Sequence, residues 1–218
     1  MAMPYRRTEN VVRRLAAREQ AILDAAIALA AEGGMNAVQI AAVAQRAGIA
    51  AGTVYRYFPS KADLVADLVA AAAGRELTAM TQAADAAPGP LSALAAAIAT
   101  FSARALGERR LAWALIGEPV DAEIDAMRLD FRQSLAAELR ARIETAVAGG
   151  HLPEQDAGIA APAIVGALME GLLSPQAPQP ADAAAVRAAV QSATLFALRA
   201  LGVVDARARG LVAQCALP

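Results

Sequence analysis

The chain has 218 residues, enough for one large domain or for two small domains with separate cores. Hydrophobic residues make up 57% of it, with alanine the commonest of them, whereas aromatic residues make up only 4%. Alanine is the strongest helix former, and the β-branched and aromatic runs that are typical of strands are scarce. We therefore expect an all-α fold and exclude β-rich classes of protein.

The net charge of −1 conceals an uneven distribution. Residues 1–61 contain eight basic and four acidic side chains and carry +4, so residues 62–218 carry −5. A basic segment joined to an acidic one indicates a polyanionic partner for the first part alone. A chance distribution of surface charge is the alternative interpretation.

Targeting and membrane signals are weak in this sequence. The longest uncharged stretch, 86–103, contains Pro88 and Pro90, and its portion after Pro90 is shorter than the roughly 20 apolar residues of a membrane span. No apolar segment comes after the basic N-terminus as it would in a signal peptide. The single cysteine, Cys215, excludes an internal disulfide. We expect a cytoplasmic protein that makes no membrane contact.

The first sixty residues predict an arm followed by three helices. Residues 1–14 are polar and rich in arginine, as is typical of a mobile arm. Apolar residues at helical spacing predict a helix over 16–32, which Gly33 and Gly34 terminate. Two short helices are predicted next, over 39–47 and 51–58, separated by Gly48.

A longer helix is expected from about residue 61, capped by Ser60 with Asp63 in its first turn. This helix is predicted near 62–86, and further helices are predicted near 91–106, 108–116, 121–148, 156–173 and 183–201, separated by glycine and proline. Pro162 either kinks its helix or marks a later start. We divide the chain into domains at 1–61 and 62–218.

Residues 38–58 have the spacing of a helix-turn-helix, with a tight turn at Gly48. The small residues Ala44 and Ala47 allow the two helices to approach closely, and four apolar residues can form a shared wedge: Ile40, Val43, Ile49 and Val54. The second short helix is too short to be stable alone. Its polar and aromatic side chains suit the major groove of DNA.

The run AGIAAGTVYRYFPSK, from Ala47 to Lys61, resembles the signature of the TetR/AcrR family of regulators. The segment from Arg18 to Ala26, with Leu29 and Gly34, looks like the first helix of that family. The resemblance covers about residues 14–68, and the rest is similar in length and helical content alone. It implies a three-helix helix-turn-helix DNA-binding domain followed by a helical ligand-binding and dimerisation domain. The function it implies is that of a repressor that releases its operator when a small-molecule effector binds.

The resemblance also implies roles for individual residues on double-stranded operator DNA. Gly52 and Thr53 open the recognition helix, and Tyr55 and Tyr57 reach phosphates or base edges. Lys61, the only lysine in the chain, binds phosphate at the start of the fourth helix. Further candidates for base or phosphate contacts are Arg56 and, from the arm, Arg13, Arg14 and Arg18.

Five positions depart from the family pattern. Gln39 and Ala41 stand where a Ser or Thr and a basic residue are usual, so that one phosphate contact is lost or is replaced by Gln39. Ala50 and Ala51 stand where Ser and Lys usually precede the recognition helix, and the missing cap costs about 1 kcal/mol locally. Ala30 replaces a usual Phe. These departures put the affinity and the operator sequence in doubt, but not the fold.

The resemblance implies a homodimer in which helices 156–173 and 183–201 of both copies form a four-helix bundle. The expected interface residues are Ile159, Leu168, Leu172, Val190 and Leu198. An effector pocket is expected among the helices of 64–150, and its candidate residues are Phe101, Arg104, Trp113, Ile116, Met127 and Phe131. The richness in alanine predicts either a roomy cavity or close helix packing.

Two other functions compete with that of a regulator. An enzyme is disfavoured because the sole histidine, His151, lies in a predicted loop without a catalytic partner nearby, and no metal cluster or cofactor motif is evident. We therefore expect no cofactor and no metal. The alternative is a helical protein-interaction module that retains a non-functional helix-turn-helix. Salt-dependent DNA binding distinguishes a regulator from an interaction module, since phosphate contacts release counterions and an interaction module makes none.

Overall fold

The computed structural model describes residues 9–118 and 122–215, and within those ranges it contains helices and no strand. This confirms the predicted all-α fold. The elements in chain order are α1 (Glu9–Gly33), η1 (Met35–Ala37), α2 (Ile40–Arg46), α3 (Ala51–Val54), α4 (Lys61–Asp85), α5 (Pro90–Gly107), α6 (Arg109–Ile116), α7 (Ala122–Ala148), α8 (Ala157–Leu168), η2 (Met169–Leu173), α9 (Ala183–Ala200) and α10 (Asp205–Gln214).

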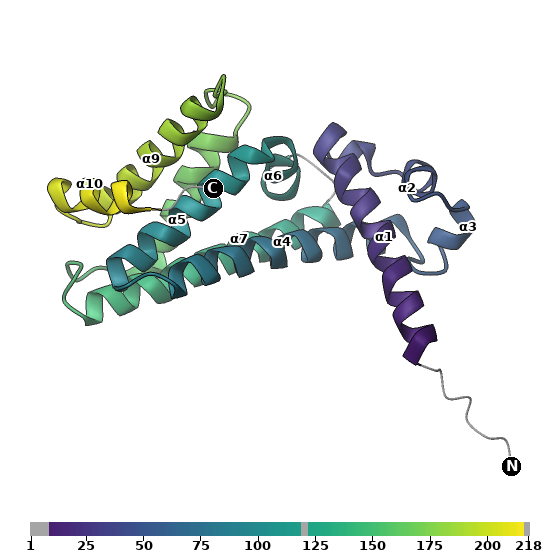
Figure 1. Cartoon of the computed structure of the whole chain (residues 1–218), viewed down its shortest axis with the longest axis horizontal. Helices are drawn as coiled ribbons and strands as arrows, with labels where there is room; N and C mark the ends of the chain where they lie inside the picture. The colour runs from purple at the N-terminus through teal and green to yellow at the C-terminus, as the bar shows by residue number, and fades with distance from the viewer. Residues whose placement is uncertain (1–8, 119–121, 216–218) are drawn as a thin grey trace, which may run out of the picture.

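Helices α1, α2 and α3 lie together at one end of the molecule (Figure 1). Helix α2 packs against both α1 and α3, and Ile22 and Ala26 of α1 are fully buried in the apolar core. Of the predicted wedge, Ile40, Val43 and Val54 are buried and Ile49 is half-buried. Hydrophobic burial therefore stabilises an element as short as α3, which would not persist alone.

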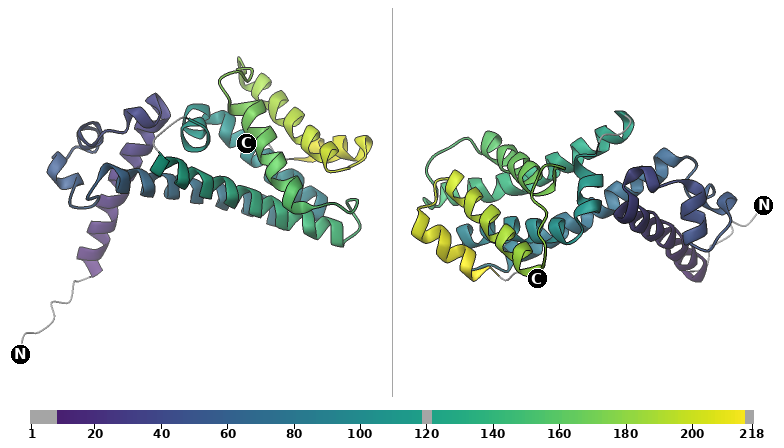
Figure 2. Two further views of the ribbon diagram at one scale, coloured as in Figure 1. Left: turned by 180° about the vertical axis from the view of Figure 1, so that it is seen from behind. Right: turned by 90° about the horizontal axis from the view of Figure 1, so that it is seen from above.

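Helix α5 is at the centre of the C-terminal part, where it packs against α4, α7 and α9 (Figures 1 and 2). By length and composition α5 is the one described helix able to cross a membrane, but most of it is buried inside the protein. Its apolar character is explained by this position, since a helix surrounded by other helices is apolar on most sides. The long helices α4 and α7 lie side by side beneath it.

The structure corrects the expected arm and adds two features that the sequence left open or did not indicate. Helix α1 begins at Glu9, so residues 9–14 are helical rather than part of an arm, while residues 1–8 lie outside the described part. A tenth helix, α10, was not expected from the sequence. Pro162 lies inside α8, and that helix continues into a π-helical turn, η2, over Met169–Leu173.

The domain boundary expected between residues 61 and 62 falls in the first turn of α4. Leu64, Val65 and Leu68 of this helix are fully buried. Since α4 packs against α1, α5 and α7, one continuous helix connects the end formed by α1, α2 and α3 to the rest of the chain.

Candidate DNA-binding surface and effector cavity

The turn between α2 and α3 is built on a left-handed glycine. Gly48 has φ +65°, a conformation that costs glycine little because it has no Cβ. The Ile49 N–H donates to the Ala44 carbonyl at 3.0 Å and the Gly48 N–H donates to the Gln45 carbonyl at 3.2 Å, which satisfies carbonyls at the end of α2. The chain is thereby turned so that α3 packs on α2.

The outer side of α3 and of the turn after it presents polar and aromatic groups to solvent. Gly52 and Arg56 are exposed, and Tyr55 has 51% of its surface accessible although it is a large ring. Thr53 and Tyr57 are half-buried. The exposure of Tyr55 is informative, because a tyrosine retained for packing would be covered.

Lys61 is held at the first position of α4 by a capping box. The Asp63 N–H donates to Ser60 Oγ at 3.1 Å, and the Ser60 N–H donates to Asp63 Oδ2 at 3.0 Å. This reciprocal pair satisfies two backbone donors and sets where α4 begins. Lys61 is therefore the first residue of a helix whose start is fixed by the capping box, and its side chain is half-buried.

The departures from the family pattern are visible at two helix starts. Gln39 and Ala50 occupy the N-cap positions of α2 and α3, and neither side chain accepts a capping hydrogen bond. The Gln39 side chain is exposed, and its Nε2 donates to the Asn36 carbonyl at 3.0 Å. A contact between Gln39 and phosphate would therefore compete with this local bond.

The three arginines expected on an arm lie instead on the first three turns of α1. Arg13, Arg14 and Arg18 are all exposed there. Another arginine connects two of these helices. Arg46 of α2 donates two hydrogen bonds, of 2.6 and 2.7 Å, to the Glu32 carboxylate of α1. The Arg46 bonds hold the pKa of Glu32 below its usual value.

Four of the six predicted effector residues line one cavity between α4, α5, α6 and α7. Phe101, Arg104, Ile116 and Phe131 surround it, together with Glu76, Ala105, Glu108, Leu111, Ala112 and Leu115. Trp113 and Met127 do not line it, and Trp113 lies instead at a separate cavity beside Arg109 and Arg110. Two of the lining residues form an ion pair, in which Arg104 donates to both carboxylate oxygens of Glu76 at 2.8 and 2.7 Å.

The cavity is nearly filled, with a volume of about 20 Å³. That is room for about one water molecule. A drug-sized ligand needs several hundred Å³, so binding one there requires its walls to separate. The alanine-rich helices thus pack closely at this point rather than leaving a roomy pocket.

The residues predicted for a subunit interface are mostly buried inside the single chain. Leu168, Leu172, Val190 and Leu198 all belong to its core, and only Ile159 is exposed, at 68%. An apolar groove of about 580 Å³ remains open between α8, η2, α9 and the segment before α9. Leu168 and Leu172 line this groove together with Phe196, which is 55% exposed.

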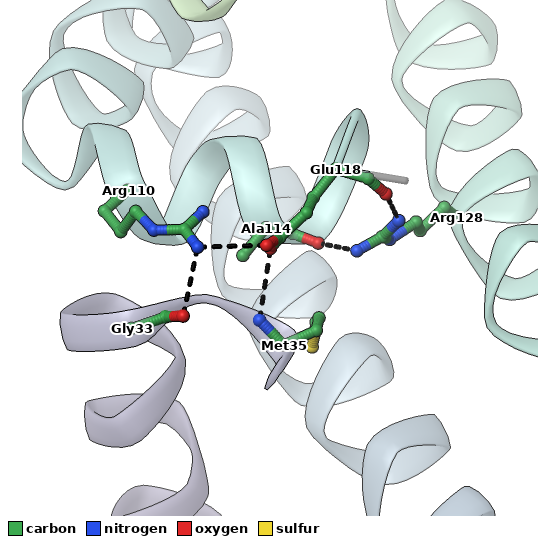
Figure 3. Close-up of polar contacts among 6 residues, drawn as sticks. All are labelled: Gly33, Met35, Arg110, Ala114, Glu118 and Arg128. Carbon is green, nitrogen blue, oxygen red and sulfur yellow. Dashed lines mark hydrogen bonds and ion pairs between the residues drawn. The ribbon is translucent and has the colours of Figure 1, made fainter. Parts of the chain in front are cut away.

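Helix α6 joins the two ends of the molecule through polar contacts with the end of α1 (Figure 3). Arg110 Nη2 donates to the Gly33 carbonyl at 3.0 Å and to Glu118 Oε1 at 2.9 Å. The other carboxylate oxygen, Glu118 Oε2, accepts the Met35 N–H at 3.1 Å. We call this group, Arg110 and Glu118 on the segment Gly33–Met35, the latch.

A buried arginine holds the backbone on which Glu118 of the latch is carried. Arg128 of α7 is fully buried and donates to the carbonyls of Ala114 and Glu118. Burial raises the pKa of Glu118, but the bonds from Arg110 and Met35 and the charge of Arg128 outweigh it, so that its pKa lies below the usual value. Glu118 is thus ionised at neutral pH. Sequence patterns do not reveal these residues, because the contacts join distant segments.

Metal binding has no visible basis in residues 9–118 and 122–215, where no group of three or more His, Cys, Asp or Glu side chains is arranged to hold an ion. The turn at Gly48, the exposed face of α3 and the capped start of α4 define a helix-turn-helix DNA-binding protein with a second, larger helical part.

Comparison with known proteins agrees with this class. The profile of the family "Bacterial regulatory proteins, tetR family" matches residues 22–68. The transcriptional repressor KstR of Rhodococcus jostii is 57% identical over 53 residues, which are 24% of this chain and 25% of that protein. The fatty acid metabolism regulator protein of Bacillus subtilis is 43% identical over 47 residues. The matched region spans about a quarter of the length of these curated relatives.

The whole fold is shared more widely than the sequence. RolR in complex with resorcinol superposes with a TM-score of 0.66 over 95% of this chain and 98% of that chain, at 21% identity. FadR from Bacillus subtilis in complex with stearoyl-CoA gives a TM-score of 0.70 over 85% of this chain and 98% of that chain, at 22% identity. Residues 22–68 thus match the tetR family of bacterial regulatory proteins, and the remainder of the chain resembles these regulators in fold alone.

Proposed function

We propose that the chain is a cytoplasmic transcriptional repressor that binds operator DNA as a homodimer and leaves it when a small-molecule effector binds. The observation that carries this is the exposed, uncovered face of α3 in a helix-turn-helix whose sequence matches that of the KstR repressors. Tyr55, Arg56 and Lys61 lie on that face or beside it. The curated relatives are regulators and not enzymes, so no catalytic role is proposed.

Replacing Tyr55 by alanine is expected to weaken operator binding by about tenfold or more, because a good base-edge contact is worth about 1–3 kcal/mol. Folding should be unchanged, since half of this side chain is already in solvent. Affinity is measured by fluorescence anisotropy on duplexes that the wild-type protein selects from a random-sequence library. Tyr55→Phe is the matched control that keeps the ring and removes the hydroxyl.

The salt dependence of the same binding separates the repressor from the protein-interaction alternative. A repressor that neutralises phosphates loses affinity steeply as salt is raised, and removing Arg56 should lower the slope of log K against log[salt] by about 1 if it contacts a phosphate. A folded wild-type protein that selects no duplex at low salt would favour an interaction module with a non-functional helix-turn-helix.

We propose the cavity between α5, α6 and α7 as the effector site, with Phe101, Arg104, Ile116 and Phe131 in contact with the ligand. Its apolar walls and single ion pair fit a mostly apolar small molecule. RolR and FadR are described in complex with resorcinol and stearoyl-CoA, which supports a small-molecule effector here without naming its class. Because the cavity has a volume of only about 20 Å³, binding of such a molecule would have to separate its walls, and we propose that α6 is the wall that moves.

Enlarging Ala112 to leucine is expected to abolish the response to effector, measured as effector-induced release relative to the variant's own DNA affinity, because the added side chain fills the cavity. Candidate effectors are compounds that release the wild-type protein from DNA in a screen. Ala96→Leu is the matched control, since Ala96 lines a separate cavity between α4, α5 and α10. If Ala96→Leu loses the response and Ala112→Leu retains it, the effector site lies at that other cavity.

The homodimer is proposed to form through the open faces of α8 and α9. Small residues Ala163 and Gly166 on α8 and Ala189 on α9 let helices approach closely, and Phe196 and Ile159 supply exposed apolar surface. One helix-turn-helix reads a single half-site, so two copies give the two half-sites about 34–36 Å apart that such proteins use. Effector binding would favour a dimer with a different separation.

A further inference from the structure

Helix α6 has two faces with different surroundings. One face lines the proposed effector cavity through Leu111, Ala112 and Leu115. On the other face, Arg110 reaches the end of α1. A short helix that lies between a ligand cavity and the DNA-binding helices cannot move on one face without disturbing the other, because packed interiors deform in discrete steps rather than continuously.

The contact with α1 is specified by charge and by backbone shape together. Gly34, between the two latch contacts, has φ +73° and is buried, so the segment is pressed against α6. A methyl group on Gly34 would overlap the Arg110 guanidinium and lie 2.6 Å from Glu118 Oε2. Glu118 is 13% exposed, and it is the one side chain that bonds both the Met35 backbone and Arg110.

We propose that Arg110 and Glu118 are positioning residues whose latch on Gly33–Met35 sets the orientation of the helix-turn-helix on α6, so that a shift of α6 is transmitted to α3 through it. The proposal rests on the function proposed above and names the contact that couples the two sites. Arg128 keeps the carboxylate in place by binding the Glu118 carbonyl.

Coupling of this kind is reciprocal, which allows a test before any effector is known. If the latch couples the position of α6 to the position of the DNA-binding helices, DNA binding must in turn stabilise α6. The measurement is hydrogen–deuterium exchange of the full-length protein, free and saturated with a selected duplex, read on peptides that cover Arg109–Ile116. Glu118→Gln keeps the shape of the side chain and removes its charge.

DNA is expected to slow exchange in α6 several-fold in the wild-type protein, within the roughly 5- to 150-fold range typical of coupled sites. In Glu118→Gln, the logarithm of the DNA-induced slowing of exchange in α6 should be less than about half of its wild-type value, even when the protein is saturated with DNA. The matched control is Glu144→Gln, which removes an exposed ion pair with Arg140 on α7 and should keep full protection.

Arg110→Gln is the second variant, and the double variant with Glu118→Gln should lose no more protection than either single variant if the two residues act as one unit. DNA-induced protection of α6 that is absent from the wild type, or that is retained in Glu118→Gln, would overturn the proposal. A merely structural role for Glu118 predicts retained protection.

The latch is tested separately in the free protein, so that a failure of DNA binding remains distinguishable. Exchange at the Met35 amide, read by NMR without DNA, should be faster in Glu118→Gln than in the wild type and unchanged in Glu144→Gln. If no duplex is selected but Met35 exchange responds, the proposed function fails and the latch stands. Unchanged Met35 exchange overturns the latch itself.

Discussion

Gly34→Ala is expected to destabilise the protein by about 2–4 kcal/mol, more than any other glycine-to-alanine change at a left-handed position on the DNA-binding end. Alanine at φ +73° carries a backbone cost of about 1–2 kcal/mol. Its methyl group also overlaps Arg110 and approaches Glu118, so the latch must separate. The free energy of unfolding is measured by urea titration monitored by circular dichroism.

Gly48→Ala is a closely matched control for this prediction. Gly48 has φ +65°, almost the same as Gly34, yet a methyl group there would meet no atom within 4 Å. Its variant should therefore lose only the backbone cost of about 1–2 kcal/mol. Equal destabilisation at the two positions would show that the latch contributes nothing to stability beyond the strain of the turn.

Phe196→Asp is expected to convert the dimer into a folded monomer and to reduce operator affinity by several orders of magnitude. Phe196 is 55% exposed in the single chain, so an aspartate there is solvated in a monomer but is buried and unpaired in an interface. Specific sites are bound about 10³–10⁷ times more tightly than non-specific DNA, and a single half-site loses much of that difference.

Sedimentation velocity gives the oligomeric state of the Phe196→Asp variant, and circular dichroism checks its fold. Leu129→Asp is the matched control, because Leu129 is 48% exposed on α7 and does not line the groove that includes Phe196. A Phe196→Asp protein that remains dimeric and binds the operator normally would place the interface elsewhere on the chain.

The DNA-binding end was largely predictable because its signals are local in the sequence. Gly48 terminates α2, and Ser60 with Asp63 caps α4, through bonds that span at most five residues. Such contacts depend on residue type and spacing alone. The sequence by itself therefore determined the helix-turn-helix, the succession of long helices and the resemblance of residues 22–68 to the tetR family.

Tertiary structure decided which side of each later helix is buried. Val190 and Leu198 belong to an apolar stripe in the sequence that suits an intersubunit bundle, yet they pack within the chain, whereas Phe196 on the same helix is exposed. A hydrophobic stripe shows that a helix has a buried face, but it does not show whether the partner is the same chain or a second copy. The predicted effector residues were likewise separated by packing, with Trp113 placed outside the cavity.

The latch illustrates the same limit most clearly. Met35 and Glu118 are 83 residues apart, and nothing in the residues around either position indicates that they meet. Their hydrogen bond exists because α6 packs across the end of α1, and that packing depends on the burial of side chains from several helices at once. Local sequence thus determined the DNA-binding motif, whereas long-range packing determined how it is joined to the proposed effector cavity.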